Sequence, residues 1–360
     1  MNNPLQGSIP NPFTACKVVA VDVDPADYHR QEPGIERGNP VFVQTRSCLM
    51  DFRRDGPSKW RATTREKKDT DATDFGTLQD VRAMTPHRLE QRYVLTPATC
   101  TATKTMKIVK TGKAAAGDPI PWNAHCAEAK EWKEAQEYEG KIVLDADQYA
   151  DSNEALKRLS DDERISELFA CSDKQVLIVG EYRDTETGLV IPVKTLIDLK
   201  PRTEAEGIFL KSLADFKTAR RADPGSWPFA VDERDYDAQA AMSLWLAGAA
   251  EPERDWQGFL HAGQENTHPF EPFRRWLDME FIELGRLKIL TALKSYCACL
   301  AANQWPGWDD TSSFPGMEGW GQTSAPFKAL MREEKQTAIP TEGISTSNPV
   351  NQDPNELVTP

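Results

Sequence analysis

The sequence has no run of eighteen or more apolar residues, so no segment is predicted to cross a membrane as a helix. Residues 1–13 are polar and rich in Pro and Asn, without the basic and then apolar order of a secretory signal peptide. The seven cysteines are scattered, odd in number and without paired CxxC motifs, which argues against a zinc ribbon or a disulfide framework. We therefore expect a cytoplasmic protein with reduced, mostly structural thiols.

Histidine is also scarce, and basic residues are fewer than acidic ones. The five histidines form no HxH or HExxH motif, and no phosphate-binding P-loop is present, so zinc hydrolase and ATPase functions have little support. Lys and Arg number 43 against 56 Asp and Glu, and the net charge of −13 argues against a protein that coats nucleic acid nonspecifically. The net charge does not exclude a nuclease, because such an enzyme needs only a local basic track and its metal site itself requires acidic residues.

Three apolar segments of strand length follow one another in the middle of the chain. They are residues 175–181, 189–199 and 209–217, and short polar turns separate them. Strands joined in this way form an antiparallel meander. Helical spacing of apolar residues surrounds it, at 47–60, 75–84, 236–246 and within 269–300. The pattern predicts an α/β domain.

The composition divides the chain into three parts. Residues 1–40 are predicted to be an N-terminal extension, with an edge strand near Val18–Val23, and residues 41–310 to be one domain. Residues 311–360 lack the apolar content of a folded segment and are predicted to be mostly disordered.

Two acids and a lysine stand out in the meander. Asp198 lies near the end of one strand, and Asp215 and Lys217 lie two apart on the next, so these two point to the same face. Carboxylate oxygens bind Mg²⁺, which polarises a phosphodiester and lowers the pKa of bound water, and a nearby lysine can orient that water. A surface ladder of opposite charges is an equally good interpretation of these three residues alone.

A longer set of motifs resembles the exodeoxyribonuclease VIII family of phage-type recombination exonucleases. In chain order the similar pieces are SCLMDF at 47–52, FGTL at 75–78, Glu181 with TGL at 187–189, Asp198, DFKT at 215–218, YDAQAA at 236–241 and WPGW at 305–308. Their shared order, rather than any one piece, carries the resemblance.

The resemblance implies a PD-(D/E)XK nuclease fold, with a mixed central sheet flanked by helices. It implies an exonuclease that uses Mg²⁺ or Mn²⁺ to degrade linear duplex DNA, often from the 5′ end, in recombination or phage-related DNA processing. It also implies a ring-shaped homo-oligomer and a single-strand annealing protein as partner.

The resemblance also implies roles for individual residues. Asp198 and Asp215 would bind the metal, and Lys217 would orient the nucleophile. Asp80 stands where the family has a metal-binding histidine, and an aspartate there can still bind Mg²⁺. Glu181 would support the site from the first strand, and Gln239 would help to position DNA.

Residues near the third strand are candidates for DNA contacts. Lys211 and Arg220 are part of a local basic concentration, and Tyr236 belongs to the family's helix beyond the site. Trp227, in the loop after the strand, is a candidate for stacking on an end base.

Two other functions stay open. Asp80, and Ser243 in place of the family's tyrosine, leave room for a catalytically weakened DNA-binding or assembly protein on a nuclease scaffold. A nuclease directed at RNA or at invading DNA would use the same site.

Overall fold

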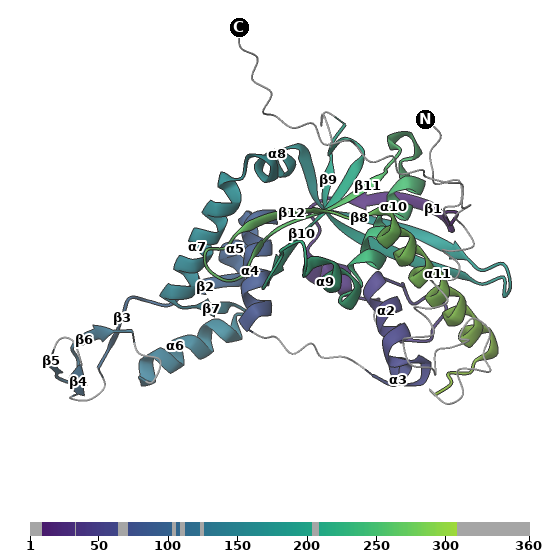
Figure 1. Cartoon of the computed structure of the whole chain (residues 1–360). Coiled ribbons are helices and arrows are strands. Elements are labelled where there is room, and N and C mark those ends of the chain that lie inside the picture. Colours follow the sequence, from purple (N-terminus) through teal and green to yellow (C-terminus); the bar gives the residue numbers. More distant parts are fainter. Residues whose placement is uncertain are drawn as a thin grey trace, which may run out of the picture.

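The computed structural model describes residues 9–32, 34–63, 71–102, 106–108, 112–122, 126–203 and 209–307. The predicted C-terminal tail lies outside these residues. A six-stranded sheet in the order β1-β8-β9-β10-β11-β12 forms the centre of the described part (Figure 1). Its strands are β1 (Phe13–Ala20), β8 (Ser172–Arg183), β9 (Val190–Pro201), β10 (Ser212–Ala219), β11 (Gly258–Glu265) and β12 (Pro272–Trp276).

The sheet is mixed, as predicted. Strands β8, β9 and β10 form the expected antiparallel meander. Strand β11 then pairs in parallel with β10, because helices α9 (Trp227–Glu233) and α10 (Tyr236–Ala250) make the crossover that a parallel pair requires. Strand β12 returns antiparallel to β11. The protein is therefore a mixed α/β protein with helices on its central sheet.

The predicted N-terminal extension supplies the edge strand of this sheet. Strand β1 pairs with β8 and begins earlier than the apolar stretch at Val18–Val23 suggested. Two register shifts interrupt the pairing, and irregular pairing of this kind is common at sheet edges. After β1 the short helix α1 (Pro25–His29) begins, with Asp24 as its N-cap.

Helices cover both faces of the sheet, and the alternation of side chains along β10 shows how. Leu213 packs into a core cluster that includes helices α2 (Arg46–Asp55), α10 and α11 (Met279–Ala302). Ala214 and Phe216 point the other way, into a cluster with α4 (Asp71–Met84), α7 (Ala146–Asp161) and α8 (Glu163–Cys171). Successive strand residues face opposite sides of a sheet, so one strand connects two cores.

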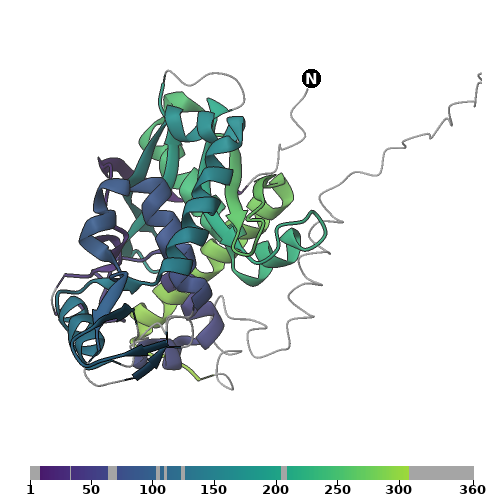
Figure 2. The same ribbon diagram turned by 90° about the vertical axis from the view of Figure 1, so that its left-hand side faces the viewer.

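The remaining elements lie around this body. Short elements α3 (Pro57–Ala62), η1 (Pro86–Arg88), α5 (Leu89–Arg92) and η3 (Pro252–Arg254) connect the main helices and strands. A small lobe with its own apolar cluster lies away from the central sheet (Figures 1 and 2). It contains β3 (Thr99–Thr101), β4 (Met106–Ile108), β5 (Gly112–Ala114), β6 (Pro119–Pro121) and α6 (Ala127–Tyr138), between β2 (Tyr93–Leu95) and β7 (Ile142–Leu144). Within the described ranges, no helix has the length and apolar character needed to cross a membrane.

Candidate active site

The candidate site forms where strands β9 and β10 separate. The two strands pair through Ala214 and Leu199, and beyond that point the backbone of β10 lacks a partner on β9. The carboxylate of Asp198 fills the gap, because its Oδ2 accepts a hydrogen bond of 3.0 Å from the backbone N–H of Phe216. A buried N–H group needs such a partner. Asp198 is thereby fixed beside the next strand.

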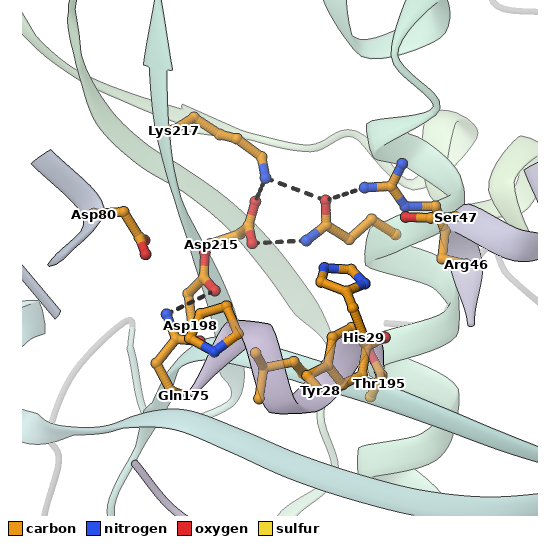
Figure 3. A pocket seen from close by; sticks show the side chains of 13 residues that line it. Tyr28, His29, Arg46, Ser47, Asp80, Gln175, Thr195, Asp198, Asp215 and Lys217 are labelled. Carbon is orange, nitrogen blue, oxygen red and sulfur yellow. Dashed lines mark hydrogen bonds and ion pairs between the residues drawn. The ribbon is translucent and has the colours of Figure 1, made fainter. Parts of the chain in front are cut away.

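Asp215 and Lys217 lie on the same face of β10 and form an ion pair (Figure 3). Gln239 of α10 joins both of them. Its Nε2 donates to Oδ1 of Asp215 at 2.7 Å, and its Oε1 accepts from Nζ of Lys217 at 3.2 Å. The predicted acid, lysine and glutamine are thus connected by hydrogen bonds.

Asp80 reaches the same place from helix α4. Gly76 lies one turn earlier on that helix, and a Cβ there would be 2.6 Å from Oγ1 of Thr218 on β10. Residues four apart share a helix face, so the close approach at Gly76 brings Asp80 toward the strand. Asp80, Asp198 and Asp215 therefore converge from three elements.

These residues line a cavity of about 240 Å³. Its walls are formed by Pro25, Tyr28, His29, Arg46, Ser47, Asp80, Gln175, Thr195, Leu196, Asp198, Asp215, Lys217 and Gln239. The three carboxylates lie on one side in Figure 3, and His29, Arg46 and Ser47 lie on the other. The cavity thus has an acidic half and a half rich in hydrogen-bond donors.

The carboxylates of Asp80, Asp198 and Asp215 lie close enough together to shift one another's pKa. Burial, and then the negative charge of Asp215, raise the pKa of Asp198 well above its ordinary value. Burial also raises the pKa of Asp80, to about 6, with Lys217 opposing the change. Burial disfavours the charged form of Asp215, but Lys217 outweighs it and holds the pKa of Asp215 below its ordinary value. The three carboxylates therefore hold more negative charge close together than Lys217 alone neutralises.

This donor set fits a hard divalent cation. A cation would offset this excess negative charge, and three carboxylates offer the oxygen ligands that Mg²⁺ and Mn²⁺ prefer. Within the described residues, however, His, Cys, Asp and Glu side chains form no ready-made group of three around one point. Binding would require the carboxylates to draw together.

Other predicted site residues lie outside the cavity. Glu181 is exposed on β8 opposite Pro192, and it does not line the cavity. Lys211 is paired with Asp255 at 2.8 Å at the start of β10, and Arg220 is exposed beyond the end of that strand. The structure therefore does not bring these three residues to the carboxylates.

The aromatic candidates are buried. Tyr236 is 8% exposed, and Nζ of Lys217 lies 4.7 Å from the centre of its ring. Trp227 is 4% exposed and packs against Phe273, with ring centres 4.8 Å apart. The prediction that Trp227 stacks on an end base is wrong, because its ring faces the core. The ring of Tyr236 therefore packs against the ammonium group of Lys217.

Several residues in the cavity wall were not predicted from sequence. Arg46 donates from Nη2 to Oε1 of Gln239 at 3.1 Å, which connects helix α2 to the lysine and glutamine. Ser47 follows it, inside the motif already noted at residues 47–52. His29 comes from α1, and Gln175 comes from the first strand of the meander. Only Ser47 had a sequence signal.

A second cluster of buried charges fixes the start of α10. Nζ of Lys288, on α11, lies 3.1 Å from Oδ1 of Asp235 and 2.9 Å from Oδ2 of Asp237. Lys288 is 3% exposed and Asp237 is fully buried. Because Asp237 lies in the first turn of α10, this contact ties the start of the helix that carries Gln239 to α11.

Comparisons with known proteins give distant matches. No family model and no curated protein matches the sequence. A crystal structure from Eubacterium rectale, designated an exonuclease, has 13% identity and a TM-score of 0.45, and covers 80% of this chain and 89% of that one. Rai1 of Scheffersomyces stipitis has 16% identity and a TM-score of 0.22, with 81% of each chain covered. Likeness at this level assigns neither a fold family nor an activity.

Proposed function

We propose that this protein is a metal-dependent exodeoxyribonuclease of the PD-(D/E)XK type that hydrolyses linear duplex DNA. The observation that supports the proposal is the convergence of Asp198, Asp215 and Lys217 in one cavity, where strands β9 and β10 separate. Buried charges without a function are costly, so two carboxylates and an ammonium group gathered at the edge of a core favour a catalytic centre over a surface charge ladder.

Each residue of the site would have its own role in phosphodiester hydrolysis. Asp198 and Asp215, with Asp80, would hold Mg²⁺ or Mn²⁺, which supplies a polarised phosphate and an activated water. Lys217 would orient that water and stabilise the negative charge that develops on the phosphate. Gln239 would keep Lys217 and Asp215 in place, because it contacts both. Arg46 and Ser47 would face the phosphate backbone.

The test compares the degradation of end-labelled linear duplex DNA and of covalently closed circular duplex. Wild type and the Lys217→Ala variant are assayed with Mg²⁺, with Mn²⁺ and with EDTA. We expect the linear substrate alone to be degraded, only with metal, and at least about a hundredfold more slowly by the variant. Lys211→Ala is the matched control, because Lys211 immediately precedes the same strand and lies outside the cavity.

A second candidate is a DNA-binding or assembly protein on a nuclease scaffold. The lack of a ready-made three-ligand group within the described residues favours it. Binding of DNA ends by folded wild-type protein, without cleavage under either metal, would support this candidate and reject the nuclease. Cleavage of RNA but not of DNA would support a nuclease that uses the same active site on a different substrate.

A further inference from the structure

The first strand of the meander brings a residue of unusual conformation to the cavity. Gln175 has a φ of +50°, which side chains other than glycine rarely adopt, and it is 1% exposed. The pairing of β8 with β9 runs from Ser172–Pro201 to Arg183–Val190 and is interrupted only at Gln175. The residue opposite that interruption is Asp198.

The side chain of Gln175 contacts this same aspartate. Its Nε2 donates to Oδ1 of Asp198 at 3.4 Å, while Oδ2 of Asp198 accepts from the backbone N–H of Phe216. Each carboxylate oxygen of Asp198 therefore has its own donor. Among the described residues, the Oε1 atom of Gln175 is buried without a hydrogen-bond partner, and the one hydrogen bond of this amide group is the bond to Asp198. A buried polar atom without a partner costs free energy.

The N-terminal segment holds the backbone of Gln175 in this conformation. The N–H of Val23 donates to the carbonyl of Gln175 at 3.1 Å, and the N–H of Asp22 donates to the carbonyl of Lys174 at 2.9 Å. Strained backbone persists only where the surrounding structure maintains it, and such positions cluster at functional sites. The contacts from Asp22 and Val23 are that surrounding structure.

We infer that Gln175 is a positioning residue that orients the Asp198 carboxylate for cation binding. This is the supporting role from the first strand that the family resemblance implies for Glu181. This inference rests on the proposed metal-dependent function. Groups that hydrogen-bond a metal-binding side chain fix its orientation, and their loss typically lowers metal affinity by about 10- to 100-fold.

The experiment measures Mn²⁺ binding to the full-length protein by electron paramagnetic resonance, together with thermal unfolding. Gln175→Met keeps the length of the side chain without its amide, and Gln175→Gly also removes the backbone strain. We expect both variants to bind Mn²⁺ at least about tenfold more weakly than wild type. We expect the glycine variant to unfold at the same or a higher temperature. A merely structural role would instead change affinity and stability in the same direction.

The Asp198→Ala variant tests whether the effect of Gln175 acts through Asp198. Adding Gln175→Met to it should cause no further loss of Mn²⁺ affinity, because the carboxylate that Gln175 contacts is already absent. A full additional loss would overturn the inference, and so would folded Gln175→Met protein that binds Mn²⁺ within twofold of wild type. Failure of wild-type protein to bind Mn²⁺ at all would instead reject the proposed metal centre, and this inference with it.

Discussion

Gly263 of β11 lies directly beside Lys217 of β10, so closely that a Cβ at position 263 would be 1.8 Å from the carbonyl oxygen of Lys217. The backbone of β10 or β11 would have to move to admit a methyl group. The absence of a side chain at Gly263 therefore determines the position of Lys217.

We expect Gly263→Ala to lower the free energy of unfolding by at least about 2 kcal/mol, because overpacking against backbone cannot be relieved by rotating a side chain. The proposed nuclease activity of this variant should also fall, because Lys217 would be displaced. Gly248→Ala is the matched control, since no other part of the described structure lies within 4 Å of a Cβ at that helical position. It should stabilise the protein by up to about 1 kcal/mol. Chemical denaturation checks both, and equal stability of the two variants would contradict the prediction.

Lys288 should be essential for stability because it neutralises buried carboxylates. Lys288→Met would leave the buried Asp237 without its cation, while Asp235 would keep its ion pair with Arg54, and breaking a buried ion pair on one side costs about 3–5 kcal/mol. Lys294→Met, on the same helix, removes a half-exposed lysine that lies 3.7 Å from Glu186, and should cost less than about 1 kcal/mol. Urea denaturation measures both values. A loss of similar size in the two variants would show that the buried cluster contributes little.

Asp80 should make stability depend on pH in metal-free protein. Its pKa is about 6 in the folded protein and 3.8 in the unfolded chain, so the folded state binds its proton more tightly. The stabilisation is complete below pH 3.8 and is lost as the pH rises through about 6.

We therefore expect Asp80→Asn to unfold less readily than wild type at pH 7, by an amount on the order of 2 kcal/mol, and to show a flatter profile between about pH 4 and 6. Asp161→Asn, at the exposed end of α7, is the control. Thermal unfolding in EDTA across this pH range gives the comparison. If the unfolding temperature of Asp80→Asn changes with pH in parallel with that of wild type, the raised pKa of Asp80 would be contradicted.

The parts of this fold that could be predicted are those that local pattern determines. Apolar runs and turns identified the three strands of the meander, and their two-residue period placed Asp215 and Lys217 on one face. The helix at residues 75–84 followed from the spacing of Leu78, Val81 and Met84 and appears as α4. Within such segments each side chain's direction follows from its neighbours in sequence.

The parts that could not be predicted depend on contacts between distant segments. Strand β11 pairs with β10 only because α9 and α10 carry the chain across the sheet, and its sequence has no clear alternation. Glu181 seemed suited to the site by residue type, but the register of β8 with β9 places Gln175 opposite Asp198 instead. A positive φ at glutamine has no sequence signature, so the supporting residue could be found only in the structure.

The strand and short helix that precede the meander have a practical consequence. Residues 13–29 belong to the predicted N-terminal extension, yet β1 completes the sheet edge and α1 supplies Tyr28 and His29 to the cavity wall. The residues that line the candidate site therefore do not all come from the predicted main domain at 41–310. Any minimal fragment cut at residue 40 would expose β8 along its length and open the cavity to solvent on one side.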